Sequence, residues 1–217
     1  MTIVYGIDCG QRNLAITKMV SQNGKCSIER MDLIDLGKGK LVFSPLHKYH
    51  SRYMLELGTV FIEYQHRPGK SQSVSYYLLG YLAGMGHNVD FVHSKAKFGV
   101  ATKFGLCEPL EGKTSYKQRK NHSIAIMKTV CKILDYPIPS YAKLDDVADA
   151  LLYAIVCMND VDPASTANLD QRKGVVHIDL EKQDELDLSL NTLLITEPEP
   201  SPPTAPTSAS APSASAP

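Results

Sequence analysis

The chain has 217 residues, of which 43% are hydrophobic, and its 23 Lys and Arg residues balance 23 Asp and Glu residues. This length can bury one good core with a small appendage, but hardly two full domains. No run approaches the roughly 18–20 continuous apolar residues of a membrane span, so we expect no membrane partner.

The zero net charge conceals an asymmetry along the chain. Residues 1–143 hold 20 Lys and Arg against 10 Asp and Glu, whereas residues 144–217 hold 3 against 13. A basic body favours a polyanionic partner, because Lys and Arg release counterions condensed on phosphates. Ordinary solubilising charges would give the same count, so charge alone does not decide the partner.

Cysteine usage and the N-terminus indicate the compartment. The five cysteines are scattered without a CxxC pair, which is typical of reduced, buried thiols rather than of a disulfide framework or a zinc site. The residues before Ile3 hold neither a charged nor an apolar leader. We therefore expect an intracellular protein that is not secreted.

Strand patterns open the chain. Apolar residues alternate with polar ones over residues 3–8, 13–21 and 26–36, which predicts three strands, and Asn23-Gly24 favours a tight hairpin turn between the last two. Three antiparallel strands are the expected arrangement.

Helical and strand patterns then alternate. We expect helices at 45–57, 71–85, 115–134 and 144–159, and strands at 59–64 and 88–93. The Gly- and Lys-rich residues 95–113 are left without an element. This order predicts an α/β protein with a mixed five-stranded sheet flanked by helices.

Composition divides the chain into three parts. Residues 1–159 form the predicted folded domain, and residues 160–196 form an acidic C-terminal extension with one possible short strand at 174–180. Residues 197–217 are rich in Pro, Ser, Ala and Thr, which cannot bury enough surface to offset the entropy of ordering, so we expect a disordered tail.

Acidic residues stand at positions that favour chemistry. Asp8 ends the first strand pattern, and Glu63 lies within the apolar strand "VFIEYQ", where an unpaired carboxylate is costly to desolvate. Asp146 and Asp149 are spaced i, i+3 on one face of a predicted helix, with Asp145 beside them. Each also has a structural reading: an Asx turn for Asp8, an ion pair for Glu63, and helix capping for the aspartates.

A shared metal site would explain these residues together. Two carboxylates about 4 Å apart repel by roughly 4 kcal/mol at an effective dielectric near 20, so several in one pocket favour bound cations. Carboxylates and water suit Mg²⁺. Two such ions activate a water and neutralise the leaving oxygen in a displacement at phosphorus. The pattern therefore indicates phosphodiester cleavage.

Nucleotide binding is not expected. Gly69-Lys70-Ser71 and Gly112-Lys113-Thr114 resemble phosphate loops, but a Walker loop needs another glycine five residues earlier. Tyr64 and Cys107 occupy those positions. We therefore expect no nucleotide cofactor.

Three motifs in order resemble those of RuvC-like Holliday junction resolvases. They are "GIDCGQRNLA" at 6–15, "FIEYQ" at 61–65 with Arg67 close behind, and "KLDDVADALLYA" at 143–154. Arg12-Asn13, "YKQRKN" at 116–121 and the doubled aspartate are more similar to the poxvirus, large-DNA-virus and fungal mitochondrial branch than to the bacterial one. The absence of a leader leads us to expect a viral or bacterial-type origin rather than a mitochondrial one.

The resemblance implies an RNase H-like, RuvC-type fold over about residues 1–158. It also implies that Asp8, Glu63, Asp146 and Asp149 hold two Mg²⁺ ions, with Mn²⁺ as a substitute and Asp145 as the alternative to Asp146. The implied protein is a homodimer that nicks two strands of four-way or branched DNA symmetrically and leaves ligatable ends.

Basic residues near the motifs are the expected DNA contacts, although each could equally belong to a solvated surface. The first choices are Lys117, Arg119 and Lys120. The second choices are Arg67, Lys70, Lys95 and Lys97.

Other functions stay open at this point. Another RNase H-like nuclease would keep the carboxylates but cut an RNA-DNA hybrid, branched DNA or RNA. A non-catalytic junction-binding protein would bind without cutting. An actin-like ATPase or sugar kinase shares the Gly-Ile-Asp-x-Gly pattern, but its duplicated domain does not fit into the predicted core.

Overall fold

The computed structural model describes residues 1–10, 12–37, 44–66, 68–109, 112 and 114–171. One sheet has the strand order β3-β2-β1-β4-β5. β1 pairs antiparallel with β2 and β2 with β3, whereas β4 runs parallel to β1 and β5 parallel to β4. The predicted mixed five-stranded sheet is therefore confirmed. The strands are β1 (Thr2–Cys9), β2 (Asn13–Gln22), β3 (Lys25–Asp35), β4 (Thr59–Glu63) and β5 (Asn88–Val92).

The expected hairpin joins β2 and β3. Gln22 pairs with Lys25, so only Asn23 and Gly24 form the turn. Both have positive φ, 53° and 71°, which asparagine and glycine tolerate better than other residues. This local chemistry sets the register of the hairpin.

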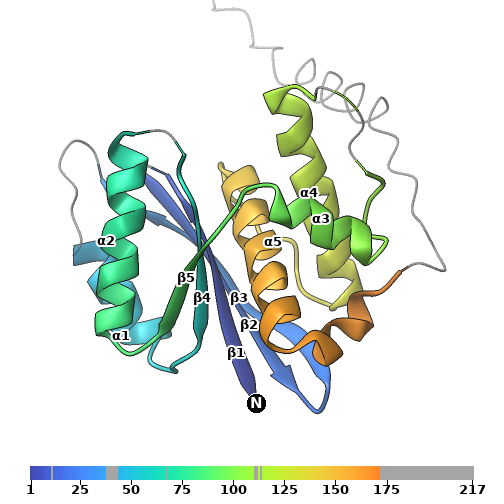
Figure 1. Ribbon diagram of the computed structural model, residues 1–217, viewed down its shortest axis with the longest axis horizontal. Coiled ribbons are helices and arrows are strands. Elements are labelled where there is room, and N and C mark those ends of the chain that lie inside the picture. The colour runs from blue at the N-terminus through green and yellow to red at the C-terminus, as the bar shows by residue number, and fades with distance from the viewer. Residues whose placement is uncertain (11, 38–43, 67, 110–111, 113, 172–217) are drawn as a thin grey trace, which may run out of the picture. The chain divides into compact units, whose positions relative to one another are not determined.

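Helices cover both faces of the sheet (Figure 1). α1 (Ser44–Tyr53) and α2 (Lys70–Gly84) lie on one face. α3 (Ala96–Lys103), α4 (Tyr116–Ile133) and α5 (Leu144–Val161) lie on the other. Each predicted helix has a counterpart within a few residues of its predicted ends, except that the first ends at Tyr53 rather than residue 57.

α3 lies in the stretch for which the sequence predicted no element. It has only eight residues, includes Gly99 in its interior, and begins after Lys95, whose side chain makes no capping hydrogen bond. Its buried residues are Lys97 and Ala101, so a charged side chain occupies the face on which an apolar pattern would be sought. The helix therefore has no recognisable amphipathic signal.

Alternation along β1 divides its side chains between two cores. Tyr5 and Ile7 pack with residues of α1 and α2, whereas Val4 packs with residues of α3, α4 and α5. Because strand side chains alternate, Gly6 and Asp8 are on the same side as Val4. The carboxylate that ends the strand pattern is thus directed toward α5.

Gly6 allows α5 to cross β1 in close contact. A Cβ atom on Gly6 would lie 2.2 Å from both the carbonyl oxygen of Ala150 and the amide nitrogen of Ala154. No side chain fits at such distances, so glycine is required here by space alone. The close crossing brings the first turns of α5 toward the end of β1.

A 3-10 helix, η1 (Pro163–Leu169), continues the fold beyond residue 159. Leu169 is buried in the same core as α5, and the Asn168 side-chain amide donates to the Cys26 carbonyl on β3. The start of the predicted acidic extension therefore packs on the sheet. The possible strand at 174–180, most of the extension and the predicted tail lie outside the described residues.

Two expectations concern membranes and thiols. Within the described ranges, no helix is both long and apolar enough to cross a membrane. All five cysteines are free and buried, which confirms the expectation of reduced thiols.

Candidate active site

The parallel pairing of β1 and β4 places Asp8 and Glu63 next to each other. Ile7 is the register partner of Ile62, and one acidic residue follows each of them. Val60 and Ile62 pack toward α1 and α2, so alternation directs Glu63 to the α5 side, as it does Asp8. The first two predicted ligands therefore share one face at one end of the sheet.

α5 brings the other acidic residues to the same place. Asp146 and Asp149 lie four residues and one residue before Ala150, where α5 meets Gly6, and their i, i+3 spacing keeps them on one helix face. Four carboxylates from β1, β4 and α5 line a single cavity of about 890 Å³. The sequence separates these segments by about 50 to 80 residues, so only folding brings them together.

Other elements complete the cavity. α3 follows β5 and supplies one wall, and the start of α4 supplies another. α4 begins with a capping box in which Ser115 and Gln118 satisfy each other's backbone amides. The remaining lining residues are Cys9, Gly10, Gln65, Ser94, Lys95, Lys97, Phe98, Gly112, Thr114, Tyr116, Arg119 and Lys120.

Burial and neighbouring charges shift the pKa values of two carboxyl groups in the cavity. Burial raises the pKa of Asp8 well above its usual range, and Glu63, then Asp149 and Asp146, raise it further. Burial also raises the pKa of Asp149, although Lys97 and Ser123 oppose the increase. Asp8 thus meets mainly like charges, whereas Asp149 has a cation beside it.

Two lysines act as counterions. Lys97 Nζ lies 2.6 Å from Asp149 Oδ1, an ion pair that is not aligned as a hydrogen bond. Lys120 is paired with Asp145, and its Nζ lies 3.8 Å from Asp146 Oδ1. These ammonium groups partly balance the carboxylates.

The donor set fits hard divalent cations. Carboxylate oxygens are the ligands that Mg²⁺ prefers, and Asp149 Oδ1 is buried without an aligned hydrogen-bond donor. Within the described part of the chain, no three His, Cys, Asp or Glu side chains already form a compact metal-binding group. The carboxylate oxygens therefore suit Mg²⁺, while Lys97 and Lys120 are paired with acidic residues at the same site.

Two residues not predicted from the sequence are influenced by or bound to the carboxylates: Gln65 through a hydrogen bond and Tyr153 through nearby charge. The side-chain amide of Gln65 donates to Glu63 Oε2 at 2.7 Å. Tyr153 is fully buried, and its pKa is raised by burial and then by Glu63, Asp149 and Asp8. The spacing could have identified Tyr153, because it follows Asp149 by four residues and so shares its helix face.

Asp145 and Asp146 differ in their positions. Asp146 lines the cavity, whereas Asp145 does not and is paired with Lys120. Of the two, only Asp146 is therefore in a position to contact a group bound in the cavity.

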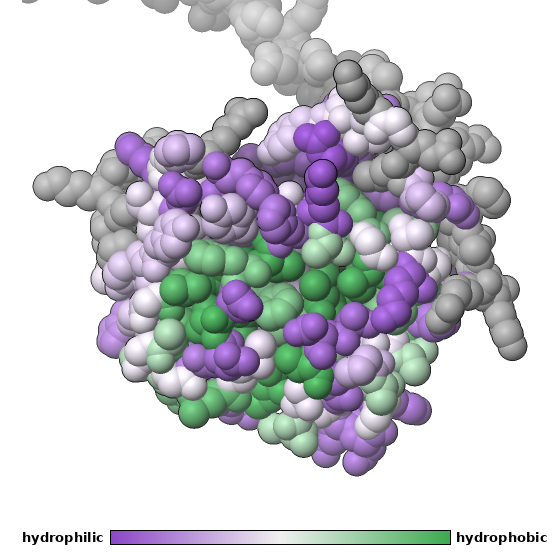
Figure 2. Space-filling model, in the orientation of Figure 1, coloured by the Kyte–Doolittle hydropathy of each residue, from purple (hydrophilic) through white to green (hydrophobic). Residues whose placement is uncertain are grey.

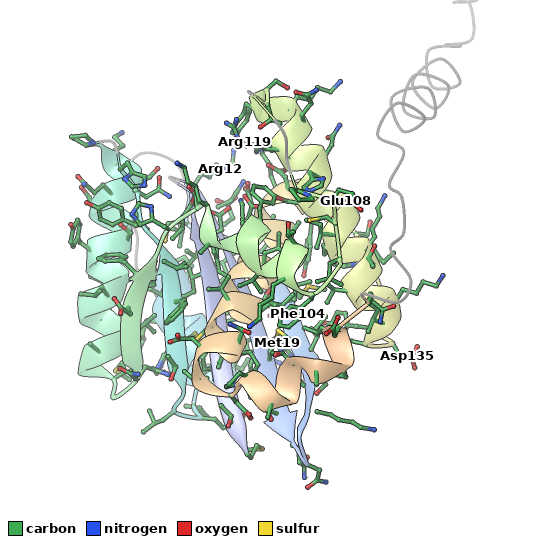
Figure 3. All side chains as sticks on the ribbon, turned by 45° about the vertical axis from the view of Figure 1, so that its right-hand side comes forward. Arg12, Met19, Phe104, Glu108, Arg119 and Asp135 are labelled. Atoms are coloured by element: carbon green, nitrogen blue, oxygen red, sulfur yellow. The ribbon has the colours of Figure 1, made fainter. Side chains whose placement is uncertain are left out.

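The predicted DNA contacts fall into two groups. Lys95, Lys97, Arg119 and Lys120 line the cavity, whereas Lys70 and Lys117 are exposed residues outside it. Arg67 lies outside the described residues. Figure 3 places Arg119 at the start of α4, at the end of the sheet where β1 ends.

The surface has a matching distribution of polarity. Hydrophilic residues gather at the end of the molecule that carries the carboxyl ends of β1 and β4, whereas hydrophobic residues gather lower on the same face (Figure 2). The cavity itself is lined by four acidic and four basic side chains, which suits a charged substrate.

Comparison with known proteins gives a family and a fold. A family model described as "Poxvirus A22 protein" matches residues 2–160. No curated protein sequence shows significant similarity to the chain.

Similar solved structures include a poxvirus resolvase and a bacterial RuvC protein. The fowlpox virus resolvase in complex with Holliday junction DNA aligns with a TM-score of 0.55 at 20% identity, covering 73% of this chain and 98% of that chain. The fowlpox resolvase without DNA aligns with a TM-score of 0.52 at 19% identity, covering 73% of this chain and 99% of that chain. Thermus thermophilus RuvC aligns with a TM-score of 0.49 at 14% identity, covering 71% of this chain and 92% of that chain. The fowlpox alignments confirm the predicted RuvC-type, RNase H-like fold.

Proposed function

The chain belongs to the poxvirus A22 protein family, and from this premise we propose that it is an endonuclease that resolves four-way DNA junctions. The observation that carries the proposal is the convergence of Asp8, Glu63, Asp146 and Asp149 on one cavity with basic residues around it. Membership of the family and similarity to a resolvase bound to junction DNA support the choice of substrate.

The four carboxylates would hold two Mg²⁺ ions, with Mn²⁺ as a substitute. When bound, such ions activate a water molecule and neutralise the leaving oxygen of a phosphodiester. Gln65 orients Glu63 through its hydrogen bond, and the packing of α5 against Gly6 fixes Asp146 and Asp149 relative to Asp8. The chain would thus supply oxygen donors from three elements around one cavity.

The basic residues of the cavity would position the DNA. Lys95 and Arg119 are exposed and line the opening, so their side chains can bind phosphate oxygens of the strand that enters. Contacts of this kind fix the position of the scissile phosphate without reading its sequence. Lys70 and Lys117 would contact DNA further from the cut.

A homodimer would place two such cavities across the junction. Each protomer would then nick one of two strands symmetrically and leave ends that a ligase can join. The enzyme would act inside the cell, wherever the DNA is replicated.

The test compares substrates of equal length in Mg²⁺: a four-way junction, a linear duplex and an RNA-DNA hybrid. We expect paired, symmetric nicks in the junction only, and loss of cutting in Asp8→Asn with junction binding retained. Preferential cleavage of the hybrid would indicate another RNase H-like nuclease. Binding without any cutting by the native chain would indicate a non-catalytic junction-binding protein.

A further inference from the structure

Lys97 is a buried lysine in the wall of the proposed active site. Its side chain is only 8% exposed, and its ammonium lies 2.6 Å from Asp149 Oδ1. The rings of Phe98 and Tyr153 lie 5.2 Å and 5.4 Å from Nζ, within the range of cation–π attraction. Lysine is rarely buried to this extent without a partner, and Asp149 is that partner.

The Lys97 ammonium lies against the carboxylate oxygen that a metal ion would have to bind. Mg²⁺ binds carboxylate oxygens at about 2.0–2.1 Å and demands nearly octahedral geometry. An ammonium that stays 2.6 Å from the same oxygen would lie against the ion with like charge. Because the surroundings are largely shielded from water, screening would not remove that repulsion.

We infer that Lys97 is a latch on Asp149 that competes with the divalent ion for this carboxylate and is displaced when the ion binds. The inference rests on the proposed function, because it takes Asp149 as a metal ligand. In the metal-free protein the latch neutralises a buried carboxylate. In the metal-bound protein its four-carbon stem moves the ammonium off the oxygen.

Displacement gives the lysine a second partner. Lys97 shares the cavity with Lys95 and Arg119, at the end of the sheet where DNA phosphate would enter. The released ammonium can therefore bind a phosphate oxygen of the substrate. Metal binding and DNA binding would then favour each other. The metal ion releases the Lys97 ammonium from Asp149, and the DNA phosphate gives that ammonium a new partner.

Calorimetric titration of Mg²⁺ into the full chain without DNA tests the latch. Removing the competitor in Lys97→Met should tighten Mg²⁺ binding, by about tenfold if the latch is closed in nine molecules of ten. Lys95→Met is the matched control, because Lys95 lines the same cavity with the same charge but is exposed. The control should shift the affinity by less than about threefold, as expected for a screened charge.

A second variant keeps the charge and guards against misfolding. Lys97→Arg should pair more firmly with Asp149, because guanidinium binds carboxylate through two donors, and it should weaken Mg²⁺ binding. Thermal unfolding in EDTA should show Lys97→Met less stable than the native chain, with much of the difference removed by Mg²⁺.

The outcomes separate the latch from the proposed function. Equal shifts for Lys97→Met and Lys95→Met, or native affinity in Lys97→Arg, would overturn the latch while leaving the metal site in place. If the native chain bound no Mg²⁺, the metal site would fail and the latch with it. The opposite shifts of Lys97→Met and Lys97→Arg would establish the competition.

Discussion

Replacing Asp8 by asparagine should stabilise the metal-free protein at neutral pH. Burial, and then the charges of Glu63, Asp149 and Asp146, raise the pKa of Asp8 in the folded chain well above its usual range. A carboxyl with a raised folded pKa is more easily protonated in the folded state than in the unfolded state. Its ionisation therefore destabilises the fold above the folded pKa, and this cost disappears below the unfolded pKa near 3.9.

The size of the effect follows from the neighbours. One carboxylate about 4 Å away contributes roughly 4 kcal/mol of repulsion at an effective dielectric near 20. The buried asparagine amide costs about 1–3 kcal/mol if it finds no hydrogen-bond partner, so we expect a net gain of about 2 kcal/mol in the free energy of unfolding for Asp8→Asn. For a chain of this length that gain raises Tm by about 4–8 °C.

The assay is unfolding of the native chain and Asp8→Asn in EDTA from pH 4 to pH 8. The gain should be largest at pH 8 and should vanish as the pH falls toward 4. Asp35→Asn serves as a control, because the Asp35–Arg12 pair is exposed to solvent and its removal should change stability little at any pH. A gain that stays constant with pH, or a loss of stability at pH 8, would refute the reasoning.

The remaining predictions concern Asp149, Gly6 and the doubled aspartate. Asp149→Asn should stabilise the metal-free chain less than Asp8→Asn does, because it removes a buried charge whose pKa is raised but also leaves the Lys97 ammonium without its carboxylate; unfolding at pH 8 in EDTA compares the two variants, and a larger gain for Asp149→Asn would contradict this. Gly6→Ala should lower the free energy of unfolding by about 3 kcal/mol or more and weaken Mg²⁺ binding, because its Cβ would strike α5. Gly80→Ala is the control: the space around Gly80 is open, so this change should be neutral or stabilising by up to about 1 kcal/mol. Denaturant unfolding compares the two variants. Asp146→Asn should abolish nicking and weaken Mg²⁺ binding, whereas Asp145→Asn should keep part of the nicking activity and of the Mg²⁺ affinity, since only Asp146 lines the cavity. If Asp145→Asn instead lost more nicking activity than Asp146→Asn, Asp145 would be the ligand.

The sequence by itself determined the elements with strong local signals. Alternating residues predicted the strands, and Asn23-Gly24 predicted the turn between β2 and β3, because both depend on chemistry within a few residues. The four acidic candidates were also identified from the sequence, since a carboxylate in an apolar strand or beside another on a helix conflicts with its surroundings. Their role as ligands remains a prediction.

Tertiary structure alone decided how these residues meet. The closeness of Asp8 to Glu63 depends on the register of two strands, and the approach of α5 depends on Gly6, whose missing Cβ has no local signature in the sequence. α3 was not predicted because its buried face carries Lys97, and Lys97 is buried only because Asp149 arrives from a helix about 50 residues away. Charge and hydropathy patterns report on neighbours in the chain, whereas burial of a charge depends on a partner that only folding brings close.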